Sequence, residues 1–116
     1  MVKVRFYTTT KEGYKQLLAW GGALMTTRKD EALRSMLKED VEFEGMYLAK
    51  TAKIPYLVVA FMYSPHEIKY PDMSMSVNQE HRTMKDRWLK PAKGHWSMTE
   101  LDNLSLIYEL ETEDYR

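Results

Sequence analysis

Residues 54–63 read Ile-Pro-Tyr-Leu-Val-Val-Ala-Phe-Met-Tyr, and this stretch decides the fold class of the chain. Both alternating sets of side chains are apolar, with Leu57, Val59, Phe61 and Tyr63 on one side and Tyr56, Val58, Ala60 and Met62 on the other. A short run rich in β-branched and aromatic residues, apolar at both parities, is typical of a strand covered on both faces. We therefore predict a central strand over residues 54–63.

Three further segments alternate apolar and polar residues with a period of two, which is typical of strands with one buried face. They are residues 2–8, residues 41–49 and residues 104–111. In the second of these segments the polarity of the other face fades after Gly45. The sequence thus predicts four strands.

Three segments carry apolar residues at helical spacing. The first begins with Thr9 and Glu12, which have the spacing of a capping box, and we expect it to end at Gly21 and Gly22. The second covers residues 27–39. The third follows a loop over residues 65–76 and ends before Pro91, because proline cannot continue a helix.

The predicted order is β-α-α-β-β-α-β. Right-handed crossovers applied to this order give a ferredoxin-like α+β two-layer sandwich. Its four-stranded antiparallel sheet has strands 2–8 and 54–63 in the centre and helices on one face. At 116 residues and 13.8 kDa, residues 1–116 are expected to form a single domain.

Composition excludes several classes of function. Hydrophobic residues make up 44% and charged residues 29%, which is ordinary for a globular domain, and the absence of cysteine excludes disulfides and thiolate chemistry. No signal peptide is recognisable, and the longest apolar run is far shorter than the roughly 20 residues of a membrane helix. We expect a cytoplasmic protein without a membrane partner.

Charge is balanced overall but uneven along the chain. Seventeen basic and seventeen acidic residues give a net charge of zero, so bulk attraction to nucleic acid or membranes is not predicted. Residues 81–95 are nevertheless basic, and residues 96–116 hold six acids against one arginine. Two solvated surfaces explain this pattern most simply.

The second face of the 54–63 strand provides the main functional hypothesis. One layer of helices covers only one face of a sheet, and a large apolar patch commonly marks an interaction site. We predict a small protein-binding module, an adaptor or inhibitor of another protein, and/or a homodimer formed through the sheet. Otherwise the 65–76 loop or the acidic tail, residues 96–116, would cover this face. The predicted contacts combine sheet aromatics, flexible loop methionines and an anchoring tryptophan: Tyr7, Phe61, Tyr63, Met73, Met75 and Trp96.

Single-stranded nucleic acid is a less favoured alternative partner. Ferredoxin-like RNA-binding modules stack bases on aromatic residues of the two central strands, and here these strands offer Tyr7 with Phe61 or Tyr63. The possible backbone contacts are basic: Arg5, Arg82, Lys85, Arg87, Lys90 and Lys93. The neutral overall charge and the missing Gly-aromatic consensus argue against this alternative.

A third alternative rests on His81. At 100° per residue it shares a helical stripe with Val77, Met84 and Trp88, so its imidazole should point toward the core. Such a histidine is most often a structural residue with a hydrogen-bond partner. Alternatively, it acts as a base in a small-molecule cavity lined by His81 and Trp88, as in an enzymatic dimeric α+β barrel, with Tyr7, Tyr56 or Trp88 as neighbours.

The other catalytic signals are missing. His66, His81 and His95 lack the spacing of a metal motif, and the chain contains no nucleophile with an adjacent base and no Gly-rich phosphate loop. We therefore assign no catalytic residue, cofactor or metal. Whether the protein is an enzyme stays open, with binding favoured over chemistry.

Overall fold

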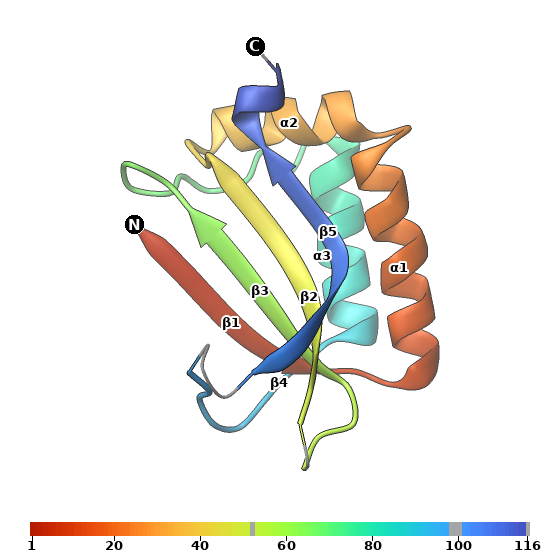
Figure 1. The fold of residues 1–116 in the computed structure, drawn as a ribbon. Helices are drawn as coiled ribbons and strands as arrows, with labels where there is room; N and C mark the ends of the chain where they lie inside the picture. The colour runs from red at the N-terminus through yellow and green to blue at the C-terminus, as the bar shows by residue number, and fades with distance from the viewer. Residues whose placement is uncertain (52, 98–100, 116) are drawn as a thin grey trace.

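The computed structural model describes residues 1–51, 53–97 and 101–115 and has an α+β fold (Figure 1). The elements in chain order are β1 (Val2–Thr8), α1 (Lys11–Met25), α2 (Lys29–Lys38), β2 (Phe43–Lys50), β3 (Leu57–Tyr63), α3 (Ser76–Trp88), β4 (Lys90–Pro91), β5 (Asp102–Glu111) and the 3-10 turn η1 (Thr112–Tyr115). The predicted class is confirmed, and the predicted order is confirmed in outline. The prediction of four strands is wrong, since the sheet has five.

The sheet is antiparallel in the order β4-β1-β3-β2-β5. The predicted ferredoxin-like order, with strands 2–8 and 54–63 as the central pair, is therefore wrong in part, because β2 is also interior and β1 is flanked on its outer side only by the two-residue β4. The additional strand β4 pairs only with Tyr7 and Thr8 of β1. It ends at Pro91, and the next residue still bonds β1 through the Ala92 N–H, which donates to the Phe6 carbonyl at 2.9 Å. The chain then crosses the sheet, so that β5 pairs with β2 at the opposite edge.

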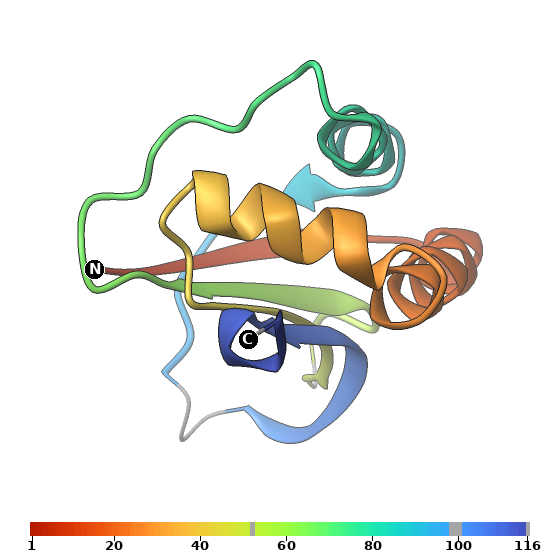
Figure 2. The ribbon, with the colours of Figure 1, turned by 90° about the horizontal axis from the view of Figure 1, so that it is seen from above.

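The two faces of the sheet are covered differently (Figure 2). The three helices lie on one face, which we call the front face, and the chain after β4 passes over the other, the back face. There Trp96 packs against Phe6 with ring centroids 5.2 Å apart, and Leu101 belongs to a buried cluster with Leu57 and Val59. The back face is therefore covered in part by the beginning of the acidic 96–116 segment, which is one of the predicted alternatives, and not by the 65–76 loop.

Helix α1 does not end at its two glycines, contrary to the prediction. It begins after Thr10, whose Oγ1 accepts from the Gly13 N–H at 3.0 Å, and it continues to Met25. A β-carbon on Gly21 would lie 2.3 Å from the carbonyl oxygen of Ile107. Gly21 therefore permits close approach of β5 to the helix and does not terminate it.

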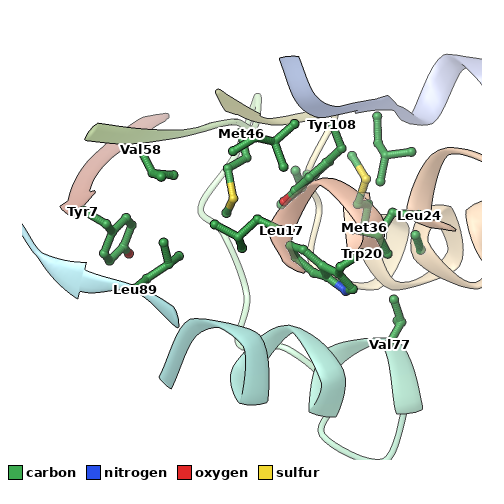
Figure 3. Packing of buried hydrophobic residues seen from close by; sticks show 14 of the residues in the cluster. Tyr7, Leu17, Trp20, Leu24, Met36, Met46, Val58, Val77, Leu89 and Tyr108 are labelled. Carbon is green, nitrogen blue, oxygen red and sulfur yellow. The ribbon is translucent and has the colours of Figure 1, made fainter. Parts of the chain in front are cut away.

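The main core lies between the front face and the helices (Figure 3). Trp20 of α1, Met46 of β2, Val77 of α3 and Tyr108 of β5 are all buried in this cluster. The segment over residues 64–75, which we call the strap, connects β3 to α3 along the outside (Figure 2). Within residues 1–51, 53–97 and 101–115, no helix is long and apolar enough to cross a membrane.

Candidate functional site

A cavity of about 660 Å³ lies between the front face of the sheet, the helices α2 and α3, and the strap. This volume lies within the range of small-molecule sites. The helices supply Trp20, Leu24, Met36 and His81 to its wall, and the sheet supplies Tyr7, Glu44, Met46, Met62 and Tyr108. The cavity is thus mostly apolar with a few polar groups, which is the composition expected of a ligand site.

Three aromatic rings form its inner wall. The Trp20 ring lies 5.1 Å from the His81 ring and 5.4 Å from the Tyr108 ring, measured between centroids. Trp20 and Tyr108 are both buried, and Figure 3 shows them projecting toward each other from α1 and β5. The indole Nε1 of Trp20 is buried without a hydrogen-bond partner among the described residues.

Glu44 of β2 connects two of these rings. Its Oε1 accepts the Tyr108 hydroxyl at 2.5 Å and lies 3.9 Å from Nδ1 of His81. The first distance is a short charge-assisted hydrogen bond, whereas the second exceeds hydrogen-bond length. Glu44 is therefore fixed by the tyrosine, and the imidazole remains available to other partners.

The environment favours the neutral form of His81 and the protonated form of Tyr108. Burial lowers the pKa of His81, and the nearby charge of Lys85 acts in the same direction against the opposing charge of Glu44. Burial raises the pKa of Tyr108 well above its ordinary value, and the Glu44 carboxylate adds to this effect. At neutral pH the site therefore presents a neutral imidazole, which can accept a proton, beside a phenol whose hydrogen is held by Glu44.

A second carboxyl group, that of Glu39, lines the same cavity at the end of α2. Burial raises the pKa of Glu39 to about 7, the charge of Glu44 adds to the rise, and the Ser35 hydroxyl opposes it. Ser35 Oγ lies 3.1 Å from Glu39 Oε2 and 2.7 Å from Asn78 Oδ1. A hydroxyl has only one hydrogen to donate. If Ser35 donates its hydrogen to Asn78, which is the closer partner, a protonated Glu39 can donate its own hydrogen to Ser35 Oγ.

Cations line the outer part of the cavity. Lys3 and Arg5 lie on the front face of β1, and Arg82 and Lys85 lie on α3. Arg5, Arg82 and Lys85 are exposed and thus mark an opening of the cavity to solvent. The Lys85 Nζ lies 5.5 Å from the centroid of the Tyr7 ring in a cation–π arrangement.

The strap forms another part of the rim and is fixed to α2. Lys38 Nζ contacts Asp72 Oδ2 at 2.9 Å, and Lys69 Nζ contacts Asp40 Oδ2 at 3.1 Å. The Lys69 N–H also donates to the Glu39 carbonyl at 3.1 Å. These contacts hold the strap against the α2 end that carries Glu39.

The residues predicted for protein binding do not share one surface. Tyr7 is buried in the front-face cavity, whereas Phe61 and Tyr63 belong by register to the back face. Trp96 packs on the back face, and Met75 packs against the front-face core from the strap end. Met73 is 36% exposed on the strap. Protein binding itself stays a prediction.

The nucleic-acid residues are also divided. Arg5 and Tyr7 lie on the front face, opposite Phe61 and Tyr63, so these residues do not form one stacking platform. Among the predicted basic contacts, Arg5, Arg82 and Lys85 converge on the cavity, whereas Arg87, Lys90 and Lys93 do not line it. The Arg87 guanidinium instead lies 5.1 Å from the Trp88 ring centroid.

Of the two predicted cavity residues, His81 lines the cavity and Trp88 does not. Trp88 lies between the helices, where its carbonyl accepts the Thr9 hydroxyl at 2.6 Å. The sequence reasoning missed Trp20, Glu39, Glu44 and Tyr108. Glu44 could have been found from the sequence, because it alternates in β2 with Met46 and Leu48, and these apolar residues mark its side of the strand as the buried one.

Comparison with protein-family models, with curated proteins and with solved structures found no match. Within the described chain, no group of three or more His, Asp or Glu side chains is placed to hold a metal ion.

Proposed function

We propose that this protein binds a small organic molecule in the front-face cavity and that His81 transfers a proton to and from it. The observation that carries the proposal is the convergence of His81, Glu44 and Tyr108 on a cavity of about 660 Å³. The His81 side chain is half-buried, with 32% of its surface exposed. The 3.9 Å separation of Nδ1 from Glu44 leaves this imidazole free to meet a ligand.

The proposed chemistry is general acid–base catalysis. The neutral imidazole takes a proton from an acidic C–H or O–H of the ligand, and the Glu44 carboxylate stabilises the resulting imidazolium. Tyr108 donates its hydroxyl hydrogen to Glu44 Oε1 and so holds this carboxylate beside the imidazole. Contacts between catalytic groups are commonly long before a ligand binds, so the His81 to Glu44 distance is compatible with this role.

Exchange of α-protons in D2O provides a direct test, with 2-tetralone as a planar ketone probe at millimolar concentration. Proton NMR measures the exchange rate, and quenching of tryptophan fluorescence measures binding. We expect His81→Gln to keep binding within threefold and to reduce the protein-dependent exchange rate at least tenfold. His95→Gln changes an exposed histidine outside the cavity and should match the unmodified protein.

Two results would contradict the proposal. If 2-tetralone fails to bind at millimolar concentration, the cavity is not a ligand site for compounds of this type. If it binds and His81→Gln exchanges its protons as fast as the unmodified protein, the imidazole is not the base. Circular dichroism on both variants distinguishes these results from a loss of folding.

A further inference from the structure

The cavity opening concentrates positive charge in a chain whose net charge is zero. Lys3 and Arg5 approach it from β1, and Arg82 and Lys85 approach it from α3. None of the four forms an ion pair within the part of the chain that the structure describes. Lys69, on the strap, is already paired with Asp40.

The alternation of β1 and the spacing on α3 explain this arrangement. Lys3 and Arg5 are two residues apart and therefore share the front face of the strand. Arg82 and Lys85 are three residues apart on one side of the helix and flank the His81 stripe. The two pairs belong to elements far apart in the sequence, so it is the fold that brings them to one opening.

Acidic lining residues do not neutralise this opening. Glu44 lies deeper, where it binds Tyr108, and burial raises the pKa of Glu39 so that its carboxyl is partly protonated near neutral pH. Glu67 lies on the strap, on the other part of the rim. The cavity is therefore polarised, with cations at the opening and rings with hydrogen-bonding groups inside.

From this polarity we infer that the ligand is an amphiphilic organic carboxylate whose anionic group binds at the opening and whose apolar body enters the cavity. This inference rests on the proposed function and specifies its ligand class. Arg5 and Arg82 are suited to a carboxylate because a guanidinium binds both of its oxygens. A phosphate held at the N-terminus of α3 is disfavoured, since Glu31 Oε1 already accepts the Val77 N–H there at 2.9 Å.

The test compares two nearly isosteric probes, 2-naphthoate and 2-naphthamide, which differ in charge at pH 7.5. Isothermal titration calorimetry gives both dissociation constants at low salt. We expect 2-naphthoate to bind at least tenfold more tightly than 2-naphthamide, and raising the salt concentration to 0.5 M should weaken only the carboxylate.

Two double variants test which cations bind the carboxylate of 2-naphthoate. The double variant Arg5→Gln and Arg82→Gln should lose about tenfold in affinity for 2-naphthoate and retain its affinity for 2-naphthamide. The matched control Arg87→Gln and Lys93→Gln removes the same amount of charge outside the cavity and should leave both affinities unchanged. All four side chains are exposed, so both double variants are expected to fold.

The outcomes separate this inference from the proposed function. If both probes bind equally, or if the Arg5 and Arg82 variant keeps the preference for the carboxylate, the cavity binds small molecules and the inferred anionic class is wrong. If neither probe binds at millimolar concentration, the inference and the proposed cavity function are both overturned.

Discussion

Replacing Glu39 by glutamine should remove much of the loss of stability that the protein undergoes as pH rises from 5.5 to 8. The structure raises the pKa of Glu39 from an ordinary 4.5 to about 7. The unfolded chain therefore releases this proton at a lower pH than the folded chain. A raised carboxyl pKa gives stability at low pH that is lost as pH rises toward and through the folded pKa.

The magnitude follows from this difference in pKa. One pKa unit corresponds to about 1.4 kcal/mol, so the full difference is worth about 3 kcal/mol as an upper limit. Part of this difference falls below pH 5.5, where the carboxyl of the unfolded chain already titrates, so about 1–2 kcal/mol is expected between pH 5.5 and 8. His81 acts in the opposite direction, because its lowered pKa removes stability as pH falls below the ordinary value of 6.5. The difference between Glu39→Gln and the unmodified protein isolates the glutamate.

Urea denaturation followed by circular dichroism at several pH values measures this difference. The Glu39→Gln variant should equal the unmodified protein near pH 5 and exceed its free energy of unfolding by about 1–2 kcal/mol at pH 8. Glutamine keeps a side-chain oxygen that can accept from Ser35 Oγ, as Glu39 Oε2 does at 3.1 Å. Glu67→Gln on the exposed part of the rim is the control and should not change the pH dependence. Equal slopes for Glu39→Gln and the unmodified protein would refute the reasoning.

Two further predictions concern the packing of α1 and α2. Gly21→Ala should lower the free energy of unfolding by about 1–3 kcal/mol, because its β-carbon would collide with the Ile107 backbone. A β-carbon on Gly22 meets open space, so Gly22→Ala should raise the free energy of unfolding by about 0.5–1 kcal/mol. Thermal denaturation of the pair checks this, and equal effects would contradict the close approach. Arg28→Gln should lower the free energy of unfolding by about 1 kcal/mol, because it removes the ion pair between Arg28 at the start of α2 and Glu80 on α3. Urea titrations in 0.5 M salt should show a smaller loss, since salt screens the ion pair.

Much of the fold could be predicted because strand alternation and helical spacing are local properties. The two-sided apolar run over residues 54–63 became the middle strand β3, and the alternating run over residues 2–8 became β1. The position of β5 could not be predicted in the same way. It depends on the chain leaving β1 after β4 and crossing the back face, and no local pattern encodes that path.

The site was predictable only in part for a related reason. Helical spacing directed His81 toward the sheet, which is where the structure places it. Its partners come from other elements, and they meet it only through the sheet register and the packing of α1. Trp20 was hidden because the glycine pair beside it was interpreted as a helix end, although Gly21 is the residue that admits β5 with Tyr108.

The two faces of the sheet separate the two leading hypotheses. The front face carries the cavity, whereas part of the back face stays uncovered, with Val2 56%, Tyr63 38% and Leu106 47% exposed. Phe43, Tyr63 and Val2 lie in one row across β2, β3 and β1. A second copy bound there would leave the cavity opening between β1 and α3 unobstructed. Self-association through the sheet, which stays a prediction, is therefore compatible with a ligand on the opposite face, and evidence for one would not count against the other.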